Sequence, residues 1–375
     1  MPDSSSTSVD SRRDPLFTPP SLPKGGGTVS IGGGMLSVGS ADGAAGWSLP
    51  LPLPTGRELS PSLTLSYSSG GGNDAFGAGW HCPLPAVSRM SRFGIPRYND
   101  DDRLAGPDGE EILRDKAGAR IERSLPFSTV IAEYTVTPWV SRSGGRGERL
   151  EHWRPNASSD SPGFWLNYHA DGSITLFGWS ASARLSDPQD PSRVAGWYAE
   201  ETVSAKGEHL VYTYRREDDG GCDAQELAAH RQVSNLYLVG VHALNATPSD
   251  ALLVPEGAFD AEDFMSVMLF DYGERNTPLD VPPPFETDAP WPVRKDRYSF
   301  WRWGFNTRVR RLCRDVMLWH RTQMMAAKAD TTPVLVSRLH LVHEHSAVAT
   351  LLISAQLVAY EPDGSPVTCH RRSSS

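Results

Sequence analysis

The chain has 375 residues, of which 34 are Gly and 30 are Pro, and its formal net charge is −9 at pH 7. A chain of this length can bury a sizeable core, and its Gly, Pro, Trp and Tyr content favours short strands and turns over helices. The acidic balance argues against a general nucleic-acid binder, which needs a concentrated basic face. We therefore predict a mainly β fold: an antiparallel, strand-rich, shell-like domain with few short helices.

The remaining global features set the boundaries of this domain. The four cysteines are widely spaced without a CxxC pair, which argues against a disulfide scaffold or a zinc ribbon. No window approaches 18 apolar residues, so we expect no membrane span, and the N-terminus lacks the apolar stretch of a secretory signal. We expect disordered tails at 1–20 and 366–375 around one β-rich domain at 21–365. Pro-rich 277–292 is a candidate sub-domain boundary.

Strand signals recur along the chain. Two apolar segments in 164–179 flank Asp171-Gly172, a strong hairpin signal. Strand-length apolar runs follow at 209–215, 235–244 and 264–273, and the segments 332–345 and 349–364 predict an antiparallel C-terminal set. A short helix is expected within 223–233.

The longest alternating pattern covers 300–313, "FWRWGFNTRVRRLC". Aromatic and apolar residues occupy one set of alternate positions, and arginines occupy the other. This period-2 pattern predicts one half-buried strand whose Arg302, Arg308 and Arg310 face water or a partner.

The Gly-rich run at 65–85 raises the question of a phosphate-binding loop. It contains neither the Gly-Lys-Ser/Thr of a P-loop nor a Gly-x-Gly-x-x-Gly sequence that could open a helix. We therefore interpret it as turn chemistry, with positive-φ positions in the "GGGND" stretch and a close chain passage at "FGAGW".

Catalytic and metal signatures are weak. The chain has no Gly-x-Ser-x-Gly elbow. His343 and His345 would share one face of a strand and are weak metal candidates, whereas His340 would point the other way. The acidic run at 98–111 lacks EF-hand spacing and is interpreted as a solvated turn. We expect no catalytic residue, no metal and no cofactor.

The ordered series of motifs resembles the N-terminal region of the SpvB family. "SLPKGGGTVS" is followed by "LPLPTGRELSPSLTLSYSSGGGNDAFGAGW", "GIPRYNDDD", "DPSRVAGWYAEETVSAKGEHLVYTYRRED" and "WPVRKDRYSFWRWGFNTRVRRLCRDVMLWHR". The resemblance covers about residues 21–364, which is nearly the whole chain. The signature positions that it marks as structural are Gly70, Gly71, Gly72, Gly77, Gly79, Trp80, Pro96, Arg97 and Tyr98.

The SpvB family comprises Salmonella virulence plasmid B proteins and the TcaC-type B components of insecticidal toxin complexes. The resemblance implies a β-sheet shell that, with RHS repeats, encloses a toxic passenger. In the plasmid virulence protein, a similar region precedes an actin-modifying ADP-ribosyltransferase domain. That domain needs a Glu-x-Glu pair, and no two Glu residues here stand at i and i+2, so we expect the transferase to be absent.

The function expected from this resemblance is a non-catalytic structural module of a secreted virulence or toxin system. Its partners would be toxin-complex components, RHS-type components or an effector polypeptide. It would act outside the cell or in host cytoplasm, without a classical signal peptide, after synthesis in the bacterial cytoplasm. Two alternatives remain open: an adhesion or carbohydrate-binding module using Trp47, Trp139, Trp179 and Trp301, or an enzyme whose motif is not recognisable.

Overall fold

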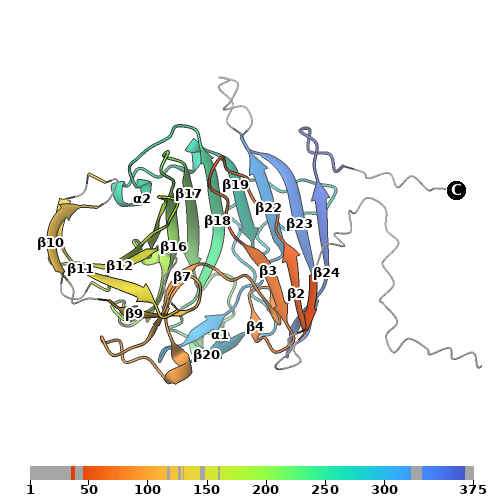
Figure 1. Cartoon of the computed structure of the whole chain (residues 1–375). Helices are drawn as coiled ribbons and strands as arrows, with labels where there is room; N and C mark the ends of the chain where they lie inside the picture. Colours follow the sequence, from red (N-terminus) through yellow and green to blue (C-terminus); the bar gives the residue numbers. More distant parts are fainter. Residues whose placement is uncertain are drawn as a thin grey trace, which may run out of the picture.

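The computed structural model describes residues 35–38, 45–115, 119–125, 128–129, 131–143, 148–158, 161–321 and 332–367 (Figure 1). The predicted tail at 1–20 and residues 368–375 lie outside these ranges. The described chain is built almost entirely of antiparallel strands, which confirms the mainly β fold class.

Eight strands of the largest sheet close into a barrel because β14 pairs with β16 as well as with β13. These strands run in the order β14-β13-β12-β11-β9-β8-β7-β16. Their bounds are β7 Ala86–Arg89, β8 Leu104–Ala105, β9 Glu111–Arg114, β11 Ile131–Ser141, β12 Arg149–Pro155, β13 Phe164–Tyr168, β14 Ile174–Phe177 and β16 Val194–Val203. Two further strands join the barrel at its side: β10 Ala119–Ser124 pairs with β11, and β15 Arg184–Ser186 pairs with β16.

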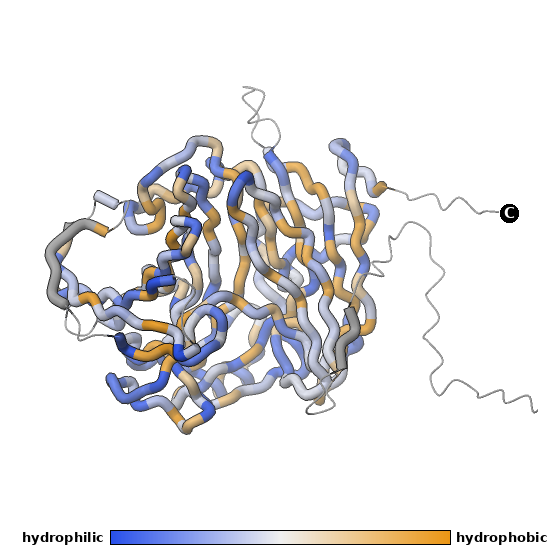
Figure 2. Tube along the Cα trace, in the orientation of Figure 1, coloured by the Kyte–Doolittle hydropathy of each residue, from blue (hydrophilic) through white to orange (hydrophobic). Residues whose placement is uncertain are grey.

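From β16 the same sheet continues outward to β24. The strands are β17 His209–Arg216, β18 Leu236–Asn245, β19 Phe264–Asp271, β22 Asp315–His320, β23 Val334–His345 and β24 Thr350–Ala359. A second, four-stranded sheet contains β1 Met35–Val38, β2 Ala45–Pro50, β3 Thr64–Ser68 and β6 Trp80–His81. Leu49 and Leu65 of this small sheet share a hydrophobic core with Leu339 and Leu341 of β23. Figure 2 shows apolar residues interspersed with polar ones along these strands.

Most of the local predictions are confirmed. Strands β13 and β14 form the expected hairpin, with Gly172 of its turn at φ +85°. The short helix is α1, Ala224–Ala229, which begins after Asp223 because that carboxylate accepts a hydrogen bond from Glu226 N. The other helical pieces in the described ranges are single turns: α2 Leu253–Glu256, η1 Ser91–Phe93, η2 Ala181–Ala183 and η3 Ala261–Asp263.

The prediction of one long strand at 300–313 is wrong. The chain instead forms β20, Tyr298–Phe300, a turn, and β21, Thr307–Val309, and these two short strands pair with each other. The turn includes Gly304 at φ +81°, a conformation that suits glycine and ends the extended run. The alternating pattern therefore spans a short hairpin, with Arg302 exposed in its turn, Arg308 buried in β21 and Arg310 buried just after it.

The Gly-rich run forms turns, as predicted, but the residues that adopt positive φ are not the predicted ones. It contains β4, Asn73–Asp74, and β5, Gly77–Ala78. The positive φ values are at Gly77 (+101°) and Gly79 (+80°), while none of the three consecutive glycines adopts one, so that part of the prediction is wrong. A Cβ on Gly77 would lie 3.0 Å from Thr350 O, which shows how closely this segment approaches β24.

The C-terminal end of the described chain turns back on β24. Gly364 adopts a positive φ of 85°, and Tyr360 then forms an antiparallel bridge with Pro366. Val367 N donates to Ala359 O at 2.8 Å. The outer edge of β24 therefore accepts a backbone hydrogen bond from the extended residues 366–367 of the same chain.

Candidate functional site

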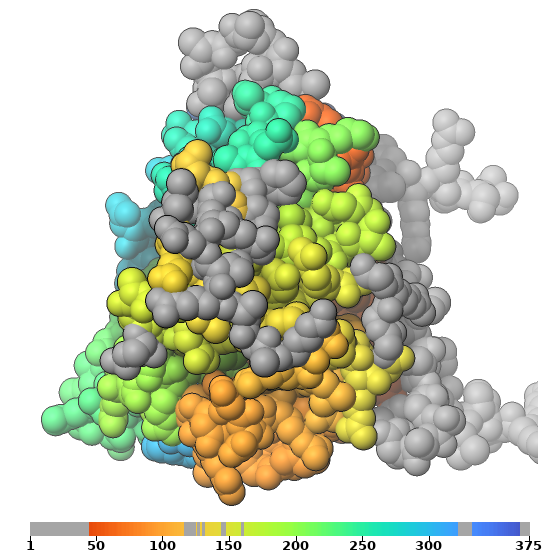
Figure 3. All heavy atoms as spheres, turned by 60° about the vertical axis from the view of Figure 1, so that its left-hand side comes forward, coloured from red at the N-terminus to blue at the C-terminus, as the bar shows by residue number. Residues whose placement is uncertain are grey.

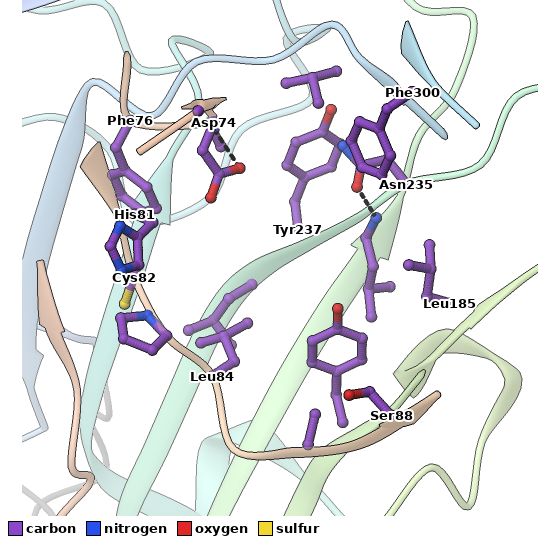
Figure 4. Close-up of a pocket in the computed structure, with 18 of the residues that line it drawn as sticks. Asp74, Phe76, His81, Cys82, Leu84, Ser88, Leu185, Asn235, Tyr237 and Phe300 are labelled. Carbon is purple, nitrogen blue, oxygen red and sulfur yellow. Dashed lines mark hydrogen bonds between the residues drawn. The ribbon is translucent and has the colours of Figure 1, made fainter. Parts of the chain in front are cut away.

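A cavity of about 680 Å³ lies where the Gly-rich segment crosses the main sheet (Figure 4). One wall comes from residues 72–76 and 81–86, and the opposite wall comes from the start of β18 and from the β20–β21 hairpin. In Figure 4, Asp74, Phe76, His81 and Cys82 gather on one side, facing Tyr237, Asn235 and Phe300 on the other. The cavity thus joins segments that are more than 200 residues apart in sequence.

The polar groups of this cavity are constrained by burial and by the backbone. Burial raises the pKa of Asp74, although its carboxylate accepts a 2.7 Å hydrogen bond from Ala75 N. Burial also raises the pKa of Tyr198 to about 12 and that of Tyr298 further. The Tyr298 hydroxyl donates to Asn73 O, which ties the β20 strand to β4. These phenols are therefore hydrogen-bond donors at neutral pH and would not act as bases.

Among the residues that line the cavity, Cys82 is the candidate nucleophile and His81 is the candidate base. Burial, with a smaller contribution from the neighbouring Asp74, raises the pKa of the Cys82 thiol to about 12. The thiolate is the reactive form of cysteine, so this environment suppresses nucleophilic attack. The cavity is consequently suited to holding a segment or a ligand by contact, with a deactivated thiol in its wall.

The family-signature residues surround this region. Trp80 packs on Tyr67 with ring centroids 5.3 Å apart, and a Cβ on Gly79 would lie 2.5 Å from the same Tyr67 ring. Gly70, Gly71 and Gly72 form the preceding turn, where Gly71 N donates to Ser68 O at 2.9 Å. Of these glycines, Gly79 passes against the Tyr67 ring, whereas Gly70, Gly71 and Gly72 contact no aromatic side chain.

The second signature group, Pro96, Arg97 and Tyr98, lies in the connection between β7 and β8. Tyr98 adopts φ +60°, which is uncommon for a residue with a side chain. Its hydroxyl donates to Trp303 O at 2.5 Å, and its backbone N, like that of Arg97, donates to Asp102. The ring lies between the guanidinium groups of Arg89 and Arg193, at 5.1 and 4.6 Å. This loop anchors the β20–β21 turn.

The three predicted partner-facing arginines have different environments. Arg302 is exposed, stacks on Phe300 at 4.4 Å and lines the cavity. Arg308 and Arg310 are 7% and 0% exposed, so the prediction that they face water or a partner is wrong. Both donate to Glu226 of α1, and this shared carboxylate explains why the two guanidinium groups turn inward.

The weak metal candidates lie close together on β23. The rings of His343 and His345 are 6.0 Å apart, and His343 Nε2 lies 3.2 Å from Phe76 O. Burial lowers the pKa of His343 to about 4. Among the described residues, no group of three or more His, Cys, Asp or Glu side chains is arranged to hold a metal ion. His340 instead pairs with Asp315 at 2.7 Å.

The tryptophans considered for sugar stacking also separate into two groups. Trp47 and Trp301 are exposed, at 46% and 59%, whereas Trp139 is buried at 9%. Trp179 packs on Phe164 with ring centroids 4.9 Å apart. Trp139 and Trp179 therefore belong to the core, and an exposed aromatic platform made from all four is excluded.

Sequence reasoning missed the acidic partners of the arginines. Arg311 donates to Glu217, and both side chains are wholly buried, while Arg294 pairs with Asp296 at 2.8 Å. The acidic run "EDDGGCDAQE" at 217–226 was visible in the sequence. The basic run "RVRR" at 308–311 carries the opposite charge, which could have suggested ion pairs between the two runs. The alternating pattern instead led to the prediction that Arg308 and Arg310 face water or a partner.

Comparison with known proteins gives the class of this mainly β module. The profile of the family described as "Salmonella virulence plasmid 65kDa B protein" (SpvB) matches residues 39–322. The chain belongs to this SpvB family. Mono(ADP-ribosyl)transferase SpvB of Salmonella choleraesuis is 39% identical over 360 residues, a match that covers 93% of this chain and 58% of that protein. The chain therefore spans little more than half the length of its curated relatives.

Solved structures agree with this assignment. The N-terminal domain of effector protein SpvB from Salmonella typhimurium strain LT2 matches with a TM-score of 0.77 and 37% identity, over 84% of this chain and 98% of that domain. A chain of the Photorhabdus luminescens Tc holotoxin pore matches with a TM-score of 0.85 and 38% identity, over 96% of this chain and 17% of that one. The TcdB2-TccC3 crystal structure gives 0.84 and 39%, over 94% and 17%.

The module thus occurs in virulence and toxin proteins, both as a domain solved by itself and within much longer chains. No helix in the described ranges has the length and apolar character needed to cross a membrane.

Proposed function

We propose that this chain is a non-catalytic structural module of a secreted virulence or toxin system, which carries or encloses a toxic polypeptide. The observation that supports it is the pair of structural matches above. Nearly the whole chain superimposes on one part of a toxin assembly, and most of it also matches an effector's N-terminal domain. A scaffold that recurs beside different toxic parts is expected to act by holding polypeptide chains.

The edge strand β24 offers the docking surface for such a partner. Within the main sheet it pairs with β23 on one side, and its sequence "TLLISAQLVA" contains neither charge nor proline. Leu351 and Ile353 are 47% and 60% exposed. Exposed edges of this kind pair readily with strands of other chains. The returning residues at 366–367 occupy only the far end of this edge.

The proposal is tested by expressing a tagged form of the chain in the bacterium that produces it. Cross-linking and mass spectrometry should recover a toxin-complex component, an RHS-type component or an effector. Leu351→Lys/Ile353→Lys should reduce recovery at least about tenfold, because two desolvated lysines oppose strand pairing. The matched control is Val281→Lys, since Val281 is 47% exposed in a loop. Recovery of no such polypeptide, or equal loss in both variants, would refute the proposal.

The proposal also implies that this stretch transfers no ADP-ribose. Purified protein incubated with labelled NAD and actin should leave actin unlabelled. Labelling above that of a boiled sample would overturn the non-catalytic assignment.

A further inference from the structure

The closed barrel holds a second cavity, of about 460 Å³, distinct from the one described above. Seven of the eight barrel strands contribute to it, from opposite sides of the ring, so it lies inside the barrel. The barrel residues that line it are Arg89, Leu104, Arg114, Thr135, Thr137, Trp139, His152, Arg154, Trp165 and Trp197. Figure 3 turns this end of the molecule toward the reader, with residues 86–115 in orange. Eight-stranded barrels of this size hold one small ligand when side chains leave room.

Tryptophans and a histidine form the floor of this cavity. The Trp139, Trp165 and Trp197 rings follow one another at centroid distances of 5.6 and 6.0 Å. His152 stacks on Trp165 at 4.5 Å. The indole N–H groups of Trp139 and Trp165 are buried without a hydrogen-bond partner among the described residues. Both nitrogens have almost no solvent-accessible surface, so these indoles line the cavity with their rings and not with their N–H groups.

His152 adds an acceptor to this floor. Burial lowers its pKa to about 3, so the ring is neutral at physiological pH. Its Nε2 lies 3.0 Å from Pro162 O and must donate to that carbonyl. The neutral ring then leaves Nδ1 as an acceptor. Together with the Thr137 hydroxyl, the floor offers both donors and acceptors.

The rim carries an excess of positive charge. Arg89 is engaged by Asp102 at 2.6 Å and by Val194 O at 2.9 Å. Arg114 pairs weakly with exposed Asp100 at 3.4 Å. Arg154 is exposed, and no acidic side chain of the described chain pairs with it. Three guanidinium groups therefore face two carboxylates, and the donors of Arg154 remain free to bind an anion.

We propose that this barrel cavity binds an acidic sugar: one hydroxylated ring carrying a single carboxylate or phosphate. The anionic group pairs with Arg154 and Arg114, the ring hydroxyls reach the Thr137 hydroxyl and His152 Nδ1, and the apolar face of the sugar packs on the indole rings. The volume accommodates a monosaccharide and lies within the usual range of ligand sites. This site goes beyond the proposed carrier function and does not depend on it, because β24 takes no part in it.

Calorimetric titration of the whole chain tests the proposal with glucuronate, N-acetylneuraminate, glucose 6-phosphate, glucose and inorganic phosphate. We expect saturable binding of at least one acidic sugar, with glucose about tenfold weaker or undetectable. The order of glucuronate and glucose 6-phosphate affinities distinguishes a carboxylate from a phosphate ligand.

Two variants localise the site. Arg154→Gln should weaken acidic-sugar binding about tenfold or more, because a charge-assisted hydrogen bond is lost. Arg231→Gln, at another exposed arginine, should leave it unchanged. Both should keep the thermal midpoint of the parent, and Arg154→Gln should leave partner recovery intact. The proposal would be overturned if no acidic sugar bound, or if Arg154→Gln bound the acidic sugar as tightly as the parent chain. It would also be overturned if glucose bound equally well, or if inorganic phosphate bound as tightly as the sugars (an adventitious ion only).

Discussion

Arg310 Nε lies 2.9 Å from Glu226 Oε1, and these side chains are 0% and 4% exposed. Arg308 Nη2 donates to the other oxygen of the same carboxylate at 2.7 Å. One acidic residue of α1 thus holds two guanidinium groups from the segment that begins at β21. Removing one member of such a buried ion cluster lowers the stability of the fold, because the remaining buried charges lose that partner.

The first prediction concerns this carboxylate. Glu226→Gln should lower the free energy of unfolding by roughly 3–5 kcal/mol, since Arg308 loses its carboxylate partner and Arg310 keeps only the exposed Asp219 at 3.2 Å. Urea denaturation followed by tryptophan fluorescence measures the change. Glu361→Gln is the control, because Glu361 is exposed, and it should change stability by less than about 0.5 kcal/mol. A shift equally small at Glu226 would show that the ion cluster contributes little.

The second prediction is the pH dependence of the same group. Burial alone would raise the pKa of Glu226, but hydrogen bonds from Arg308 and Arg310 outweigh it and lower the pKa from 4.5 to about 2. A carboxylate with a depressed folded pKa contributes stability above its unfolded pKa and loses it as pH falls. The stability difference between the parent chain and Glu226→Gln should therefore shrink between pH 4.5 and 2. A difference that stays constant down to pH 2.5 contradicts the assignment.

The third prediction tests the Gly-rich turn. Gly79→Ala places a Cβ 2.5 Å from the Tyr67 ring at φ +80°, and should cost roughly 1–3 kcal/mol. Gly72→Ala is the matched control, since a Cβ there meets nothing within 4 Å and φ is not positive. Thermal unfolding should separate the two variants by several degrees. Identical midpoints would mean that this turn relaxes freely.

The fourth prediction concerns the thiols, in a Cys369→Ser background. Burial raises the pKa of Cys82 to about 12 and that of Cys313 far above its ordinary value. Cys222 is half-buried, as Cys82 is, and burial also raises its pKa, but the nearby Arg310 and Arg311 lower it. Because the thiolate reacts, a disulfide reagent at pH 8 should modify Cys222 at least about 100-fold faster than the other two. Rapid modification of Cys82 in the folded protein would show that the first cavity opens to solvent.

The sequence was most informative where local chemistry decides the structure. The Asp171-Gly172 hairpin and the capped helix after Asp223 depend on turn and capping residues, which are visible without tertiary knowledge. The antiparallel pair β23–β24 likewise follows from two long apolar runs.

The errors arise where distant partners decide. Alternation at 300–313 does not correspond to a difference in burial, since residues 305–313 are all buried, and it could not tell that Glu226, more than 80 residues earlier, draws Arg308 and Arg310 inside. Barrel closure depends on the β14–β16 pairing, and nothing in either strand's pattern specifies it. The barrel cavity was missed for the same reason, because its arginines and tryptophans come from six separate strands.

The segment at 73–81 has its stabilising contacts at the opposite end of the chain. Asn73 bonds Arg294, some 221 positions later, and Phe76 O faces His343, 267 positions later. Residues up to 343 must therefore be synthesised before these contacts can form. Such non-local pairing makes folding slow. A chain interrupted before that point would leave the segment at 73–81 without these partners.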